Sequence, residues 1–283
     1  MSYKKITAEE KKRLLIDFLS LPIDSADEVF DRFALLDGAQ YIKGEKTQAR
    51  FLYIPGTRKD RVLLVAHADT VWDIAYTDKN IEQKIKIKDS IISGTNPDCG
   101  IGADDRSGCA MLYALRNSGH SLLIMDSEEH NKYAHILLKE KHKNILKELN
   151  RHQYMLEIDL SGTGLYSSNP KIANTKKFET FIENSLNLKS TPRVNKLGTD
   201  ITQFCTKICG VNISCAYAKQ HSPNEFINIE KWLEILDKLE KFLTPTQPKF
   251  KNSFVKNTKN NLIAFIPKTK IALKRSLKKL IKK

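Results

Sequence analysis

The segment VLLVAHADTVW, residues 62–72, places His67 and Asp69 directly after a run of apolar residues. An apolar strand that ends in a histidine can bring an imidazole ligand to the edge of a sheet. A neighbouring carboxylate can then fix the tautomer of that imidazole. A histidine at a strand end is also common as a purely structural residue. This segment alone therefore leaves both interpretations open.

Other metal-binding side chains follow apolar runs in the same way. They are Glu128 and Glu129 in SLLIMDSEEH, Asp159 in YMLEIDLSG, His221 in VNISCAYAKQHSP, and Asp104 and Asp105 in the glycine-flanked turn GIGADDRSGCAML. Ligands collect beyond the carboxyl ends of the strands in α/β sheets, so these side chains are expected to converge. Two imidazoles with several carboxylates suit a divalent metal such as zinc.

The apolar runs and amphipathic stretches predict an α/β fold. The predicted strands are Arg50–Ile54, Arg61–Ala66, Ser121–Met125, Tyr154–Ile158 and Val211–Tyr217. The predicted helices are Ala8–Leu19, Arg106–Asn117, Lys132–Leu149 and Ile229–Leu243. This order, with a hairpin-like pair of strands first, indicates a mixed, largely parallel sheet with helices on both faces. No internal repeat interrupts it.

The positive charge of the chain is concentrated at its carboxyl end. The net charge is +14, but residues 249–283 hold 12 lysines and arginines and no acid, which leaves +2 on the other 248 residues. An amphipathic stretch ends at Leu243, where the proline-containing segment LTPTQPKF begins. We therefore expect a folded domain at residues 1–243 and a basic tail at 244–283.

Composition and termini favour a soluble, cytoplasmic protein. No apolar run approaches the roughly 18 residues that span a bilayer, and the amino-terminal segment MSYKKITAEEKKRLL is charged rather than signal-like. The chain has 5 cysteines without paired C-x-x-C spacing, which favours reduced thiols packed in the body. Cys205 and Cys209 have helical spacing and are expected in the core.

Taken in order, these motifs resemble the zinc-dependent exopeptidase superfamily of aminopeptidases, di- and tripeptidases, carboxypeptidases and N-acyl amino acid deacylases. The matching segments are His67-Ala68-Asp69, Asp104-Asp105-Arg106-Ser107-Gly108, Glu128-Glu129, Asp159 and His221-Ser222-Pro223-Asn224-Glu225. Each motif is weak alone, but their shared order over residues 62–225 is specific. The resemblance implies a single catalytic domain of the zinc-peptidase type.

The resemblance also implies a role for each residue. The metal ligands would be His67, Asp104, Glu129, Asp159 and His221, with Asp104 bridging two zinc ions. Asp69 would support His67, and Glu128 would be the catalytic base that takes a proton from the attacking water. Reading the turn as D-x-R-x-G favours Asp104 over Asp105 as the bridge, and Asp105 would then pack locally or cap the following helix.

The sequence departs from the family at two places. Many relatives insert a lid or dimerisation domain between the fourth and fifth ligands, whereas only 61 residues separate Asp159 from His221 here. We therefore expect no lid domain, and the sequence indicates no oligomeric state. His130-Asn131 also follows the glutamate pair where a small residue is commoner, so the wall beside the base is expected to differ.

Two interpretations remain open for some further residues. Gly198-Thr199-Asp200 is similar to a turn near the substrate in some of these peptidases, but a helix N-cap explains it equally well. Glu225 either orients the His221 loop or is exposed. The remaining histidines are interpreted as surface or structural residues: His120, His130, His135, His142 and His152.

The function indicated first is metal-dependent hydrolysis of a peptide or amide bond, as in an aminopeptidase-like exopeptidase. The alternatives are a deacylase of small N-acyl compounds and a non-catalytic binding protein that uses the fold and the tail. The tail segment KTKIALKRSLKKLIKK mixes apolar and basic residues, which suits an anionic membrane surface or a solvated extension. Nucleic acid is disfavoured because the aromatic residues lie outside the most basic segment.

Overall fold

The apolar runs of the sequence form the strands of a central sheet in the computed structural model, which describes residues 6–191 and 198–253. The strands are β1 Gln40–Lys43, β2 Arg50–Ile54, β3 Leu63–His67, β4 Ile85–Lys88, β5 Ile91–Gly94, β6 Ser121–Met125, β7 Met155–Leu160, β8 Leu165–Ser167, β9 Lys189–Ser190, β10 Gly210–Ser214, β11 Tyr217–Ala218 and β12 Phe226–Asn228. The α-helices are α1 Ala8–Leu19, α2 Asp27–Ala34, α3 Ile74–Thr77, α4 Ala103–Ala114, α5 Tyr133–Lys141, α6 Lys143–Leu149, α7 Lys176–Leu186, α8 Asp200–Phe204 and α9 Ile229–Leu243.

The main sheet has a parallel centre. Within the described residues it contains 8 strands in the order β1-β2-β6-β3-β7-β10-β8-β9. Strand β3 pairs in parallel with β6 and β7, and β7 pairs in parallel with β10. The outer pairs β1–β2, β2–β6 and β10–β8 are antiparallel. The carboxyl ends of β3, β6 and β7 therefore lie at one edge, as the motif positions require.

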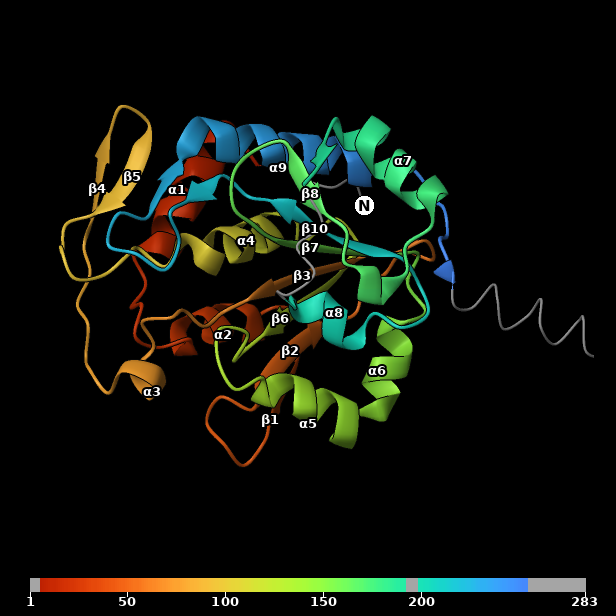
Figure 1. The fold of residues 1–283 in the computed structure, drawn as a ribbon, viewed down its shortest axis with the longest axis horizontal. Coiled ribbons are helices and arrows are strands. Elements are labelled where there is room, and N and C mark those ends of the chain that lie inside the picture. The colour runs from red at the N-terminus through yellow and green to blue at the C-terminus, as the bar shows by residue number, and fades with distance from the viewer. Residues whose placement is uncertain (1–5, 192–197, 254–283) are drawn as a thin grey trace, which may run out of the picture.

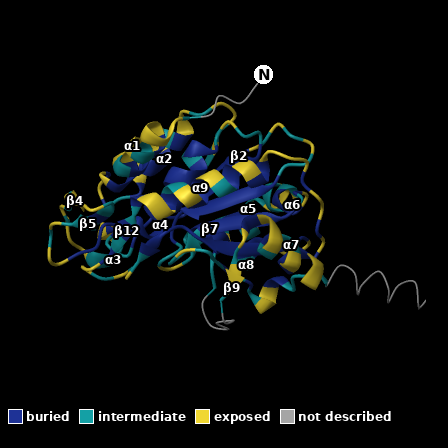
Figure 2. Ribbon diagram, turned by 90° about the horizontal axis from the view of Figure 1, so that it is seen from above, coloured by how far each residue is buried: buried dark blue, intermediate teal, exposed yellow. Residues whose placement is uncertain are grey.

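Helices cover both faces of this sheet. Alternate strand residues such as Leu64 and Ala66 pack with α1, α2, α4, α7 and α9, while Leu63 and Val65 pack with α5, α6 and α8. Figure 2 shows the buried strands enclosed between the helices, whose exposed sides face outward. The expected mixed, largely parallel α/β sheet in a single domain is confirmed.

A second, smaller sheet in the order β11-β12-β5-β4 lies beside the first. Figure 1 shows the β4–β5 hairpin projecting from the body at the left of the view. Strand β12 pairs with β5, and the chain runs on from β5 to α4. This pairing brings the loop between β11 and β12 close to the start of α4.

Three predicted elements differ in the structure. The predicted helix 132–149 is two helices that meet at His142. The predicted strand 211–217 is divided between β10 in the main sheet and β11 in the second sheet. The predicted hairpin-like pair does not form, because β6 lies between β2 and β3 and pairs with each of them.

The folded body continues past the predicted boundary at Leu243. The ring of Phe250 packs within 5.0 Å of Phe181 and 5.1 Å of Phe178, measured between ring centroids. Gln247 is also buried and accepts a hydrogen bond from the hydroxyl of Tyr154. Residues 244–253 therefore belong to the body, and the amphipathic tail segment lies outside the described residues.

We expect Phe250→Ala to lower the free energy of unfolding by about 3 kcal/mol, because the truncation removes a buried ring from an aromatic cluster. Denaturant unfolding measures this difference. Leu35→Ala is the matched control: Leu35 is 86% exposed, so its truncation should change the free energy by less than about 0.5 kcal/mol. Equal effects of the two variants would show that residues 244–253 contribute nothing to the body.

Over residues 6–191 and 198–253, none of the helices combines the length and apolarity needed to span a bilayer. All 5 cysteines are buried and unbridged. The core placement expected for Cys205 and Cys209 agrees with this burial.

Candidate metal centre

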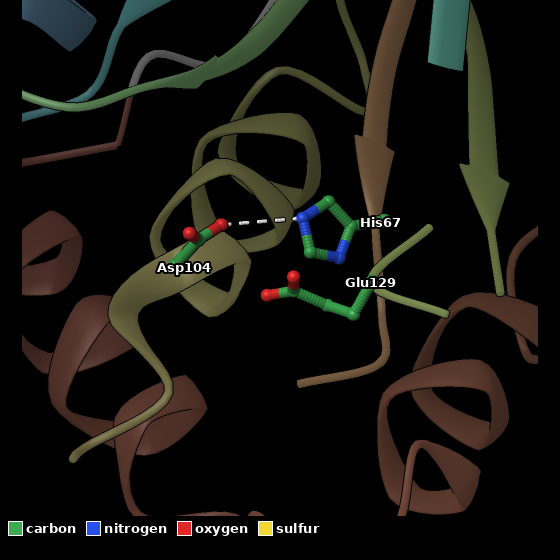
Figure 3. Close-up of side chains that lie close together, drawn as sticks. All are labelled: His67, Asp104 and Glu129. Atoms are coloured by element: carbon green, nitrogen blue, oxygen red, sulfur yellow. Dashed lines mark hydrogen bonds and ion pairs between the residues drawn. The ribbon is translucent and has the colours of Figure 1, made fainter. Parts of the chain in front are cut away.

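The carboxylate of Asp104 lies between two histidines. Its Oδ1 is 3.2 Å from Nε2 of His67, and its Oδ2 is 3.1 Å from Nε2 of His221. Figure 3 shows the carboxyl groups of Asp104 and Glu129 directed toward the imidazole of His67. The ligand atoms of these three residues lie within 4.8 Å of one another.

Two further carboxylates lie beside these residues. Among the described residues, two sets of donor atoms lie within 4.8 Å of one another: His67, Asp104 and Glu129, and His67, Asp105 and Asp159. On one side, Oδ1 of Asp159 lies 3.5 Å from Nε2 of His67. On the other side, Oε1 of Glu129 lies 3.0 Å from Nε2 of His221. All five predicted ligands are thus brought together, with one carboxylate oxygen of Asp104 beside each histidine.

The predicted ligands are positioned by the ends of the central strands and by the second sheet. His67 is the last residue of β3, and Glu129 follows β6. His221 lies in the loop between β11 and β12, which the pairing of β12 with β5 holds near Asp104. Asp104 itself stands in the first turn of α4, and the peptide bond after it is cis.

Glu225 fixes the backbone that carries Asp104. Its Oε2 accepts hydrogen bonds from the amides of Ile101 and Gly102, each at 2.8 Å, and its Oε1 accepts one from the amide of Asp104 at 3.0 Å. A Cβ at Gly100 would lie 2.4 Å from Oε2 of Glu225, so glycine permits this approach. Glu225 is 1% exposed, which excludes the interpretation as a surface residue.

Asp69 contacts three of the predicted site residues, His67, Glu128 and Glu129. Its Oδ1 and Oδ2 accept hydrogen bonds from the amides of Glu128 and Glu129, both at 3.1 Å. Its backbone oxygen lies 3.0 Å from Nδ1 of His67, closer than its carboxylate at 3.4 Å. An Nδ1–H that donates to this carbonyl leaves Nε2 as the ligand nitrogen. Asp69 therefore positions the predicted base Glu128 as well as His67.

Asp105 is placed differently from Asp104. Its Oδ2 accepts a hydrogen bond from the amide of His67 at 3.2 Å, and its Oδ1 accepts one from the amide of Gly108 at 3.0 Å. One carboxylate oxygen still lies near donor atoms of His67 and Asp159. Asp104 contacts both histidines, whereas both oxygens of Asp105 bind backbone amides, so the geometry favours Asp104 as the shared ligand.

The donor set fits a divalent cation. Burial and the charge of Asp104 raise the pKa of Asp159, and burial raises the pKa of Glu129. The hydrogen bonds to Asp104 and Glu129 raise the pKa of His221 to about 10. In the part of the chain that the structure describes, no lysine or arginine forms an ion pair with Asp104, Glu129 or Asp159. A bound cation would displace the protons that otherwise balance these charges.

Glu128 stands beside the donor groups. Its side chain is 13% exposed, and burial raises its pKa to about 7. A carboxylate with that pKa can accept a proton near neutral pH and release it again. The ammonium of Lys132 lies 3.5 Å from Oε1 of Glu128.

The turn at residues 198–200 has a structural partner. Asp200 is fully buried and forms an ion pair with the imidazole of His135, which ties α8 to α5. Thr199 occupies the N-cap position of α8, but its side chain makes no capping hydrogen bond. His135, His120 and His152 are buried and hydrogen-bonded, in agreement with structural roles.

No protein-family model matches this sequence, and no curated protein matches it. Solved structures do. The aminopeptidase PepT of Bacillus cereus has a TM-score of 0.60 at 12% identity, with 85% of this chain and 99% of that chain covered. A tripeptidase of Staphylococcus aureus has a TM-score of 0.59 at 13% identity, with 85% and 99% covered. A glutaminyl cyclase of an Acidobacteriales bacterium has a TM-score of 0.57 at 13% identity, with 87% and 97% covered.

These similarities show which fold the chain has. The chain has the fold of this aminopeptidase and this tripeptidase, which agrees at the level of the fold with the resemblance inferred from the motifs. The predicted ligands lie together near the carboxyl ends of β3, β6 and β7, the region where ligands collect in α/β sheets in general.

Proposed function

We propose that this protein is a metal-dependent hydrolase of peptide or amide bonds and acts as an aminopeptidase-like exopeptidase. The observation that carries the proposal is the position of the Asp104 carboxylate, with one oxygen toward His67 and the other toward His221. The similarity in fold to an aminopeptidase and a tripeptidase supports the same class of reaction.

His67, Asp104 and Asp159 would hold one divalent ion, and Glu129 and His221 would hold a second ion that shares Asp104. When bound, such ions polarise a carbonyl group and lower the pKa of water toward about 7. Glu128 would accept a proton from the attacking water and pass it to the leaving nitrogen as the carbon–nitrogen bond breaks. Each turnover consumes one water and yields one carboxylic acid and one amine.

Metal analysis combined with a substrate screen tests the proposal. We expect the purified protein to bind two divalent ions, with zinc as the first candidate, and to hydrolyse at least one substrate from a set of aminoacyl amides, short peptides and N-acetyl amino acids. Cleavage of only the N-acetyl compounds would make the protein a deacylase instead. A zinc-loaded protein that cleaves none of them would contradict the proposed hydrolase activity.

A further inference from the structure

Lys132 places a positive charge beside the predicted base. Its ammonium lies 3.5 Å from Oε1 of Glu128, 3.4 Å from the backbone oxygen of Glu128 and 3.4 Å from the backbone oxygen of Gly198. Charge-assisted hydrogen bonds of this kind are usually about 2.7–2.9 Å long. All three contacts are longer, so the ammonium is held in place but retains the capacity to bind an anion closely.

The backbone sets the direction of this side chain. Lys132 has a φ of 51°, in the left-handed region, and precedes the first residue of α5. Its amide donates to the backbone oxygen of Ser127 at 3.1 Å, which closes the turn that carries Glu128 and Glu129. The lysine is therefore fixed to the same turn as the base.

The side chain of Lys132 is partly exposed to solvent. The side chain of Lys132 is 39% exposed, and the neighbouring ligand His221 is 49% exposed. Arg50 and Arg106 also lie near carboxylates of this region, but both are buried. Among the described residues, Lys132 is thus the solvent-accessible cation in contact with the predicted base.

The chemistry of the leaving group indicates what Lys132 could bind. Glu128 must come within hydrogen-bond distance of the leaving nitrogen to hand over the proton. If that nitrogen belongs to an amino acid, standard bond lengths place an α-carboxylate oxygen about 3 Å from it. A cation that already reaches Glu128 lies in the region that this carboxylate would occupy.

We propose that Lys132 is a specificity-determining residue that binds the free α-carboxylate of the leaving amino acid. The preferred substrates are then amides whose leaving amine carries that carboxylate, either dipeptides or N-acyl amino acids. This inference rests on the proposed function. It narrows that function to one class of leaving group and leaves the acyl side open.

Matched substrate pairs test the inference on the full-length, zinc-loaded protein. The pairs are alanyl-leucine with alanyl-leucinamide, and N-acetyl-leucine with N-acetyl-leucinamide. Whichever pair is cleaved identifies the acyl side. We expect Lys132→Met to lower kcat/KM for the carboxylate substrate roughly 10- to 100-fold, mainly through KM, and to change the value for the amide by less than about threefold. Lys132→Arg should recover most of the loss.

Two comparisons separate binding of the carboxylate from other effects. Lys141→Met, at the exposed last residue of α5, is the control for loss of a positive charge. Calorimetric binding of leucine and leucinamide gives a readout that does not depend on turnover, and only the affinity for leucine should fall in Lys132→Met.

Two results would overturn the inference and leave the proposed function intact. One is an equal loss for both members of the cleaved pair, which would mean that Lys132 acts on Glu128 rather than on the substrate. The other is a wild-type preference for the amide. If the metal-loaded wild-type protein cleaved no member of either pair and bound leucine no better than leucinamide, the proposed function and this inference would both fall.

Discussion

Replacement of Glu128 by glutamine is expected to leave the metal content unchanged and to lower kcat by about 10²–10⁴-fold. Glutamine fills the same space in a position that is 13% exposed, but its amide cannot accept a proton from the attacking water. The backbone amide at this position can still donate to Asp69, so the turn that carries Glu129 should be preserved.

The loss of the ion pair with Lys132 does not complicate this result. That contact is 3.5 Å long and partly exposed, and ion pairs of this kind contribute little. The measurements are steady-state kinetics, metal content by mass spectrometry and thermal unfolding. Glu140→Gln, at an exposed position on α5, is the matched control. Near-wild-type turnover in Glu128→Gln would assign the base to another residue.

The central strands and the site motifs could be predicted because their signals are local. Continuous apolar runs such as residues 121–125 identify strands that are buried on both faces, and the polar residues after them mark one edge of the sheet. That is enough to bring His67, Glu129 and Asp159 together before any contact is known.

The second sheet could not be predicted in the same way. Its strands are short, and the turn between β4 and β5 is formed by Asp89 and Ser90, which have positive φ without glycine. The role of Glu225 depends on this sheet, because the pairing of β12 with β5 brings its carboxylate to the amides before α4. Such a long-range contact leaves no pattern in the nearby sequence.

The sequence signal for the contact of Lys132 with Glu128 is weaker than the signals for the strands. Lys132 lies four positions after Glu128, which is the spacing of an ion pair on a helix. In the structure, Glu128 and Lys132 are in contact through a turn with left-handed residues rather than through a helix. Helical spacing would therefore have predicted this contact from a helix that is not present. No sequence signal indicates that Phe250 packs in the core, because the proline-rich segment before it resembles a linker.

Replacement of Asp104 by alanine is expected to abolish both metal binding and hydrolysis. The carboxylate of Asp104 has one oxygen beside each histidine, so its removal leaves His67 and His221 without the carboxylate that they share. His67→Ala should also strip metal and activity, because His67 belongs to both sets of donor atoms.

Unfolding measurements in the presence of zinc provide a test that is independent of activity. A ligand that binds only the folded state raises the free energy of unfolding by about 2.7 kcal/mol at 100 times its dissociation constant. The wild-type protein should show such a rise. Asp104→Ala should show none, and Asp98→Ala, an exposed aspartate in the loop that leads to the site, should behave as wild type. A well-folded wild-type protein that zinc does not stabilise, and that carries no divalent ion under zinc-replete conditions, would contradict a metal centre built on Asp104.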